Sequence, residues 1–211
     1  LADETVSAAE TYSDKAAKQM RLVELLSAVD MLILFLLIIE QSLSSMRIIR
    51  KNRILEQKAY IDVHTGLPNK SKCEELFSDM SFITEPTACL MFDLNNLKNA
   101  NDTLGHSAGD QLIASFARVL RNVIPAKDFV GRYGGDEFVV ILYNITENTV
   151  NGLLTQLHNE VMQFNRCGNN IPISYAQGWA VSTDYTDCTL RTLFDKADHF
   201  MYTNKVRVKS E

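Results

Sequence analysis

The chain has few cysteines, prolines and glycines, and it has no excess of positive charge. Four prolines and nine glycines in 211 residues exclude a collagen-like or low-complexity polymer. Lys and Arg number 21 against 26 Asp and Glu, and the net charge of -5 argues against a general nucleic-acid binder, which would carry a basic face. With 46% hydrophobic and 22% charged residues, the composition is that of a folded domain of about 150 residues plus an appendage.

The cysteines are too widely separated to suggest a zinc site or a disulfide framework. They are Cys73, Cys89, Cys167 and Cys188, and no CxxC pair occurs. We therefore expect reduced thiols in a cytosolic domain. Because the first residue is Leu, we also expect the chain to be a fragment or a processed product.

One long apolar segment lies near the N-terminus. Residues 31–39 are apolar without interruption, and thirteen of the nineteen residues in 25–43 are Leu, Ile, Val, Met or Phe. At roughly 0.3 to 0.6 kcal/mol each, these side chains favour membrane insertion by about 4 to 8 kcal/mol. Asp30 and Glu40 each oppose insertion by about 2.5 to 3.5 kcal/mol at the bilayer centre, and by less away from it. The balance predicts a transmembrane helix at 22–43.

The flanking charges predict the orientation of this segment. Residues 44–58 carry five bases and one acid, which places the following domain in the cytoplasm by the positive-inside bias. We expect a protein of the inner or plasma membrane, with a helical tail at 1–21 that ends an external region and a basic connector helix at 44–61. The alternative for 22–43 is a dimerising helix in a signalling stalk, which would accommodate the two acids more easily.

Residues from 62 onward alternate short apolar runs with helical patterns. The predicted strands are 88–92, 129–133, 138–143 and 174–181, and the predicted helices are 110–124, 150–164 and 190–202. The order β-α-β-β-α-β-α predicts an α+β fold of the split βαβ, ferredoxin-like kind, with an antiparallel or mixed sheet and helices packed on one side.

Three acids are expected to meet at one edge of this sheet. Asp93 ends the first strand, while Asp136 and Glu137 follow the glycine turn of a predicted hairpin. Grouped carboxylates suit Mg²⁺ or Mn²⁺, and glycines let a phosphate approach the backbone. The combination suggests nucleotide chemistry; the alternative is a solvated acidic turn.

Four motifs in order resemble one family. Residues 132–138 read RYGGDEF, which resembles the signature of the GGDEF domain, the diguanylate cyclase family. Residues 62–70 (DVHTGLPNK) resemble the opening segment of that family, 92–110 its metal and guanine region, and 197–205 its closing helix. The resemblance covers 62–209. It implies a nucleotidyl-cyclase palm, with a central, mostly antiparallel sheet flanked by helices and preceded here by a long N-terminal helix.

The resemblance also implies a metal and catalytic group. Divalent metals, Mg²⁺ or Mn²⁺, would be bound by Asp93, the backbone carbonyl of Leu94, Asp136 and Glu137. Asp136 would favour loss of the proton from an attacking ribose 3′-hydroxyl, and Glu137 would complete the catalytic pair. Two cations can activate an attacking oxygen and stabilise a leaving one.

Substrate contacts are implied in the same way. Asn101 and Asp110 would bind the guanine edge, and Asp110 can accept from the N1 and N2 donors that adenine lacks. Lys98 and Lys205 would neutralise the triphosphate, while the backbone at Gly134 and Gly135 would let phosphates approach. The family joins two GTP molecules, each held by one domain of a dimer, into cyclic di-GMP. The predicted partners are therefore GTP, a second copy of the chain and a membrane.

Several departures from the family pattern leave alternatives open. His64 stands where Leu is usual, Asn95 replaces an acid, and Pro125 replaces the Arg of an inhibitory product site that retains Asp128. In the closing helix, Val208 and Lys209 replace the usual Gly and Arg, which favours a catalytically weak or silent GTP-binding module that regulates a partner. A third alternative is synthesis of another cyclic dinucleotide, which Asp110 argues against.

Overall fold

The chain divides into two compact units, residues Leu1–Leu55 and Glu56–Glu211, in the computed structural model. The backbone is described for residues 2–145, 147–168 and 171–210. Side chains are described for the same residues except 2–14, 16, 53–55, 57–58 and 207–210.

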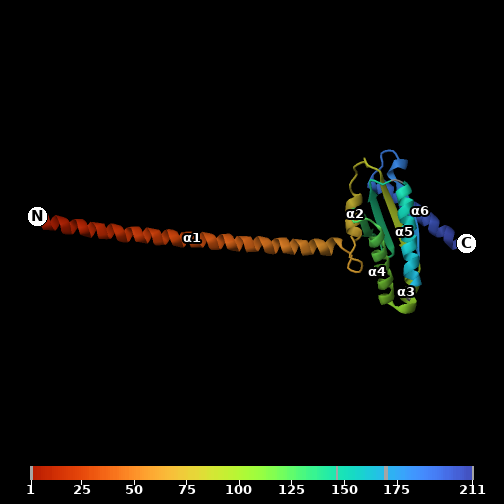
Figure 1. Cartoon of the computed structure of the whole chain (residues 1–211), viewed down its shortest axis with the longest axis horizontal. Coiled ribbons are helices and arrows are strands. Elements are labelled where there is room, and N and C mark those ends of the chain that lie inside the picture. Colours follow the sequence, from red (N-terminus) through yellow and green to blue (C-terminus); the bar gives the residue numbers. More distant parts are fainter. Residues whose placement is uncertain (1, 146, 169–170, 211) are drawn as a thin grey trace. The chain divides into compact units, whose positions relative to one another are not determined.

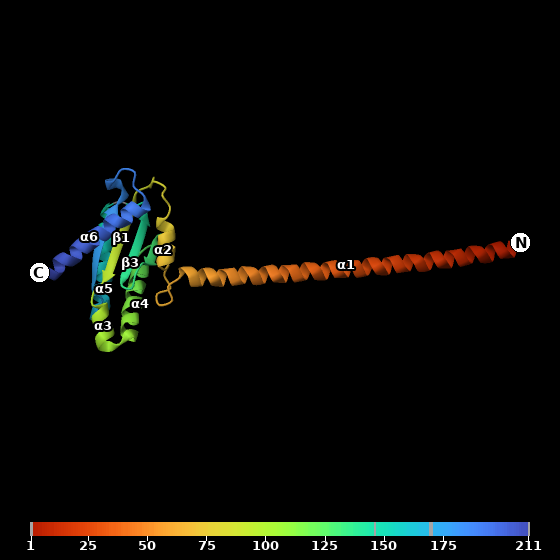
Figure 2. The same ribbon diagram turned by 180° about the vertical axis from the view of Figure 1, so that it is seen from behind.

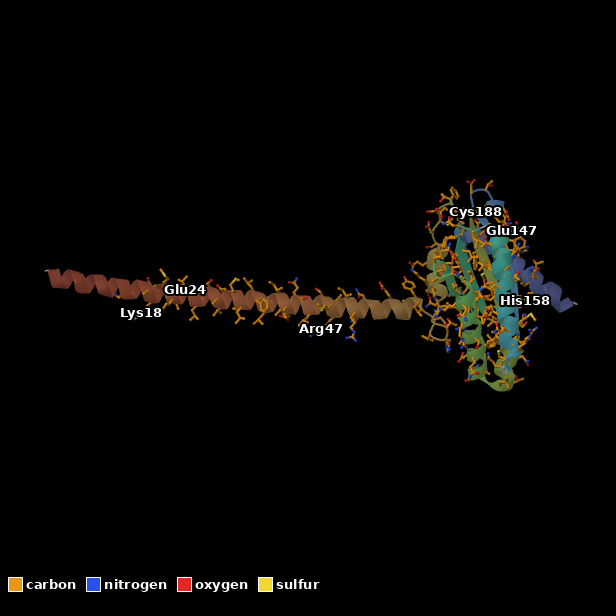
Figure 3. The ribbon with its side chains drawn as sticks, in the orientation of Figure 1. Lys18, Glu24, Arg47, Glu147, His158 and Cys188 are labelled. Carbon is orange, nitrogen blue, oxygen red and sulfur yellow. The ribbon has the colours of Figure 1, made fainter. Side chains whose placement is uncertain are left out.

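A single helix, α1 (Ala2–Tyr60), carries the N-terminal part of the chain. The predicted tail, span and connector are continuous parts of this helix, so their separate roles stay predictions. The stretch Ala17–Asn52 is long and apolar enough to cross a membrane, by length and composition alone. Every side chain of this stretch is exposed, and Phe35 keeps 60% of its surface accessible. Figure 3 shows Lys18, Glu24 and Arg47 projecting from α1.

The second unit is built on a four-stranded antiparallel sheet in the order β2-β3-β1-β4. The strands are β1 (Thr87–Leu94), β2 (Phe129–Arg132), β3 (Glu137–Tyr143) and β4 (Tyr175–Val181). All four predicted strands are present, and β2 and β3 form the predicted hairpin around the glycine turn. The predicted α+β palm with its long N-terminal helix is confirmed.

Helices cover both faces of the sheet, so the prediction of helices on one side is wrong. Helices α4 (His106–Val123) and α5 (Glu147–Arg166) pack on the face that bears Leu90, Phe92 and Val140 (Figure 1). Helices α2 (Lys70–Phe77) and α6 (Leu190–Ser210) pack on the opposite face, which bears Met91 and Val139 (Figure 2). The physical reason is that β1 is buried along its whole length, and each of its two apolar faces must be covered.

Two short helices, α2 and α3 (Leu97–Leu104), were not expected from the sequence pattern. Each has eight residues, which is too few for a clear helical period. Asn69 begins α2 by accepting a hydrogen bond from Lys72 N at 3.2 Å. Asn96 begins α3 with a φ of 62°, a conformation that Asn tolerates better than most residues.

Gly178 allows α6 to pack directly on β4. A Cβ at this position would lie 2.6 Å from Met201 Cα and would also collide with backbone atoms of α6. Asn204 adds a side-chain hydrogen bond to Gln177 O at 3.0 Å. The C-terminal half of α6 is thereby held close to the sheet.

Candidate active site

The end of β1 lies beside the start of β3. Asp93 and Glu137 are Cα partners in the antiparallel ladder, and Leu94 N donates to Asp136 O at 2.8 Å. Because side chains alternate along a strand, Asp93 and Glu137 share the α2/α6 face with Met91 and Val139. The structure therefore brings together the three acids that the sequence placed at one sheet edge.

Lys205 of α6 contacts Asp93 directly. Its Nζ lies 2.6 Å from each carboxylate oxygen of Asp93, which is 6% exposed. A buried carboxylate is costly without a partner, and the Lys205 ammonium supplies that partner. The resemblance implied a triphosphate contact for Lys205, whereas here its ammonium group binds a predicted metal ligand.

Three further carboxylates surround Glu137, and of these Asp93 is paired with Lys205. Burial raises the pKa of Glu137, and the neighbouring carboxylates of Asp136, Asp93 and Asp198 raise it further. The Glu137 carboxylate folds over Gly134, where a Cβ would collide with it. Burial also raises the pKa of Asp198, with a further contribution from Asp93.

These donors fit a hard cation, but they do not form a ready cage. Among the described residues, no group of three His, Cys, Asp or Glu side chains is arranged to hold a metal ion. The oxygen ligands are of the type that Mg²⁺ and Mn²⁺ prefer, and the Lys205 ammonium already stands as a cation on Asp93. Lys205 would therefore compete with a metal ion for the Asp93 carboxylate.

A groove of about 1240 Å³ adjoins this edge of the sheet. Lys98, Asp136 and Lys205 line it, together with the backbone that follows β1. The groove continues along α5 and β4 past His158, which Figure 3 shows on α5. Two predicted phosphate-binding lysines and a predicted catalytic acid thus share one open space.

The two residues predicted to bind guanine also lie together, at the junction of α3 and α4. The amide of Asn101 packs on Gly109, where any Cβ would collide with Asn101 Oδ1. Asp110 is the next residue, and its side chain is 50% exposed. Gly105 separates the two helices with a φ of 85°, a conformation that favours glycine.

His64 is a member of this cluster that sequence reasoning did not select. Its Nδ1 lies 3.4 Å from Asp110 Oδ1. The signal that could have found it is its departure from the Leu usual in the opening segment.

Arg132 joins the opening segment to the signature turn. It donates to Asp62 Oδ2 at 2.9 Å and to Gly135 O at 2.8 Å. Burial opposes ionisation of Asp62, but hydrogen bonds from Thr65 and the charge of Arg132 hold its pKa below the usual value. The residues that follow α1 are thus bonded to the turn that carries Asp136.

A second network, not expected from the sequence, supports Tyr133 in the signature. Its hydroxyl donates to Glu74 of α2, which also accepts from Arg191 of α6 at 3.0 Å. Burial and the Glu74 carboxylate raise the pKa of Tyr133 to about 12. The hydroxyl therefore stays protonated at neutral pH and can keep donating to Glu74.

The retained acid of the inhibitory stretch and the departures in the closing helix differ in what the structure describes. Asp128 accepts from Tyr143 N at 3.0 Å, so one of its oxygens serves the β2–β3 hairpin. The side chains of Val208 and Lys209 lie outside the described residues.

Comparisons with known proteins agree with this geometry. The family model "Diguanylate cyclase, GGDEF domain" matches residues 59–211. Signaling protein YkoW of Bacillus subtilis is 33% identical over 191 residues, 82% of this chain and 23% of YkoW. A diguanylate cyclase of Vibrio cholerae is 28% identical over 155 residues, 72% of this chain and 48% of that protein.

Solved structures give the same result. The GGDEF domain of DgcB from Caulobacter crescentus, in complex with c-di-GMP, aligns with a TM-score of 0.58 at 26% identity, covering 71% of this chain and 91% of that one. The chain spans a quarter to a half of the two curated relatives described above. The matched region and the ordered motifs show that the chain belongs to the GGDEF, diguanylate cyclase, family.

Proposed function

We propose that this chain is a membrane-tethered diguanylate cyclase, active as a homodimer, that condenses two GTP molecules into cyclic di-GMP and releases pyrophosphate. Family membership supports the coarser role in cyclic di-GMP signalling. The observation that carries the proposal is the β1–β3 register, which sets Asp93 beside the signature hairpin. Asp136, Lys98 and Lys205 line the adjoining groove.

A divalent cation, Mg²⁺ or Mn²⁺, would be held by the carboxylates of Asp93 and Asp136 and the carbonyl of Leu94, with Glu137 nearby. When bound, it would activate the attacking oxygen and stabilise the leaving one. The acidic patch that raises the pKa of Glu137 supports this assignment, because a cation would relieve the repulsion.

The chain's own residues would position the substrate and move the proton. The 3′-hydroxyl of one GTP attacks the α-phosphorus of the other, and Asp136 would favour loss of the hydroxyl proton. Lys98 and Lys205 would neutralise the triphosphate, and Gly134 and Gly135 would let it approach the backbone.

The base end of the site would select guanine. The Asp110 carboxylate can accept hydrogen bonds from N1–H and N2–H of guanine, and adenine presents no matching donors. Asn101, held against Gly109, would supply a second polar contact. The proposed substrate is therefore GTP rather than ATP.

Helix α1 would both insert into the membrane and pair with its copy in a dimer. One domain holds one nucleotide, so forming two new phosphodiester bonds requires two domains facing each other. The exposed apolar residues of 22–43, inside the candidate span Ala17–Asn52, would lie in the inner or plasma membrane, with the GGDEF domain in the cytoplasm. Pairing of α1 with its copy would control how often two sites meet.

The test is to incubate the purified full chain in detergent with GTP and Mg²⁺, then separate products by chromatography. Cyclic di-GMP and pyrophosphate should form from GTP, and no cyclic product should form from ATP. Removal of the metal with a chelator should stop the reaction. A chain that binds GTP but yields no product would contradict the cyclase.

That outcome would select the second candidate, a catalytically weak or silent GTP-binding module that regulates a partner. The observation that favours it is the Lys205–Asp93 ion pair, which occupies a carboxylate needed for metal.

We expect no tight product inhibition through the stretch 125–128. Pro125 cannot stack on guanine or bind phosphate as an Arg would, and Asp128 is engaged by Tyr143 N. Isothermal titration of the full chain with cyclic di-GMP measures this. Sub-micromolar binding that is lost in Asp128→Ala would refute the expectation.

A further inference from the structure

One face of α1 gathers polar side chains from the apolar part of the helix. Residues spaced alternately by four and three positions along 23–48 share this face, which is the heptad spacing of helices that pair lengthwise. These residues, called here the 23–48 stripe, are Val23, Ser27, Asp30, Leu34, Leu37, Gln41, Ser44 and Ile48. All of their side chains are exposed, and α1 is continuous through the whole stripe.

The opposite face of the same helix is apolar. Leu25, Leu32, Ile39 and Met46 follow one another there at steps of seven residues, and all four are exposed. Lipid tails are as apolar as leucine, so they can cover this face as well as another helix would. Of the two acids of 22–43 outside the stripe and this face, Glu40 lies at the edge of the stripe beside Gln41, and Glu24 lies near the start of the segment.

The polar residues of the stripe would lie inside the hydrocarbon of a bilayer. With Phe35, the middle of the apolar run 31–39, at the bilayer centre, Asp30 and Gln41 lie about 8 and about 9 Å from it along the helix. Both distances are below the half-thickness of the hydrocarbon, which is roughly 15 Å. Polar side chains at such depth lack water, and in membrane proteins they face other helices and hydrogen-bond there.

We propose that the 23–48 stripe is the surface through which two copies of this chain pair as parallel helices inside the membrane. The proposal rests on the proposed function, which inserts 22–43 and pairs α1 with its copy. Because the flanking bases orient every copy in the same way, a second copy presents the same polar groups at the same depth. The stripe is therefore complementary to itself, as a two-fold interface requires.

The chemistry of the polar residues supports this pairing. The amide of Gln41 can both donate and accept, so it can bond to the same amide of a second copy. The Ser27 hydroxyl of each copy can donate to the Asp30 carboxyl of the other copy, about one helical turn away. Polar groups at such positions fix the register of a coiled coil, so these two layers would set which residues of the two helices meet.

Cysteine cross-linking of the full chain in phospholipid vesicles tests which face pairs. Single cysteines replace Leu34 or Leu37 on the stripe, and Leu32 or Ile39 on the opposite face. The background is Cys167→Ser, because the other three thiols of the chain are buried. On mild oxidation, Leu34→Cys and Leu37→Cys should give linked dimers. Leu32→Cys and Ile39→Cys should not, since a disulfide needs Cα atoms within about 7 Å of each other.

Energy transfer between labelled copies of the full chain in vesicles measures the strength of pairing. Gln41→Leu and Asp30→Leu should each weaken pairing about three- to tenfold, because a hydrogen bond between membrane helices is worth about that factor. Both changes make the segment more apolar, so lost pairing would not reflect lost insertion. Asp30→Asn should restore pairing, since its amide also accepts from Ser27.

The matched control exchanges two residues, Gln41→Ile together with Ile39→Gln. This variant keeps the composition and moves the amide to the opposite face, so it should pair as weakly as Gln41→Leu. Pairing at wild-type strength in this variant would overturn the inference, because the position of the amide would not matter.

The outcomes separate this inference from the proposed function. Linked dimers from the opposite face, from all four positions equally or from none would overturn the inference. Synthesis of cyclic di-GMP by the same chains would then leave the proposed cyclase standing. Linking confined to the stripe in a chain that makes no cyclic di-GMP would support the inference and contradict the cyclase.

Discussion

The two ends of the candidate site differ in solvent exposure and in the contacts of their carboxylates. At the sheet edge, Asp93 is 6% exposed and both its oxygens are bound by Lys205 at 2.6 Å. At the α3–α4 junction, Asp110 is half-exposed and lies 3.4 Å from His64. The metal end is closed by an internal cation, whereas the base end is open to solvent. Under the proposed function, the base would bind at an open position, whereas Asp93 would hold a cation only in competition with Lys205.

The largest expected effect is on the reaction itself. Asp136→Asn should lower the rate of cyclic di-GMP formation at least about a hundredfold, because it removes a proposed metal ligand and proton acceptor. GDP affinity should change little if the base end acts independently. Asp187→Asn is the control, since Asp187 lies in an exposed loop with a φ of 51° that Asn also tolerates. An Asp136→Asn chain with wild-type turnover would remove Asp136 from the mechanism.

The Lys205–Asp93 ion pair at the metal end can be removed by replacing Lys205. Lys205→Met should let the nucleotide-free chain bind Mn²⁺ about tenfold more tightly, because Asp93 loses its internal cation. The same change should lower the free energy of unfolding by about 1 to 3 kcal/mol without metal, since Asp93 is left buried and unpaired. Electron paramagnetic resonance of free Mn²⁺ and chemical denaturation measure the two effects.

Lys196→Met, on the exposed side of the same helix, is the matched control and should leave Mn²⁺ binding unchanged. Equal Mn²⁺ affinity in wild type and Lys205→Met would show that the lysine does not compete with metal.

The base end can be broken at a glycine. Gly109→Ala should weaken GDP binding about tenfold, because the new methyl group would displace the Asn101 amide. Gly152→Ala on α5 is the matched control. Among the described residues, nothing apart from the adjacent backbone of α5 lies within 4 Å of its Cβ position, so it should bind GDP normally and gain about 0.5 to 1 kcal/mol of stability. Unchanged GDP affinity in Gly109→Ala would show that Asn101 takes no part in base binding.

The smallest expected effect concerns two acids with opposite pKa shifts. Because the pKa of Glu137 is raised in the folded chain, its negative charge lowers the free energy of unfolding. This loss appears as the pH rises from the pKa of Glu137 in the unfolded chain through its pKa in the folded chain. Because the pKa of Asp62 is lowered in the folded chain, its negative charge raises the free energy of unfolding. This gain is lost as the pH falls through the pKa of Asp62 in the unfolded chain towards its pKa in the folded chain. At neutral pH, Glu137→Gln should raise the melting temperature by about 1 to 3 °C and Asp62→Asn should lower it.

Thermal unfolding followed by circular dichroism, without divalent metal, measures both variants. If both variants changed the melting temperature in the same direction, the opposite effects expected for Glu137 and Asp62 would be contradicted. Saturating Mg²⁺ should shrink the gain of Glu137→Gln, since a bound cation would compensate the charge.

Much of the sheet could be predicted, because apolar strands bounded by turn residues give a clear pattern. That pattern predicts Asp93 next to the Asp136–Glu137 turn, and Asp93 and Glu137 are partners in the β1–β3 ladder. The continuous apolar run of β1 also carried the signal for helices on both faces, since alternation would mark a one-sided strand. The Lys205–Asp93 pair could not be predicted, because it joins residues 112 positions apart through one lysine conformation. His64 stands out only against the family pattern.

The missing side chain at Gly178 has a mechanical consequence. At Gly178 the backbone of β4 lies directly against the backbone of α6 at Met201, with no side chain between them at that point. A shift of the strand would pass undamped to the lysine four residues beyond Met201. We therefore expect that a ligand bound at the sheet edge also changes the position of α6.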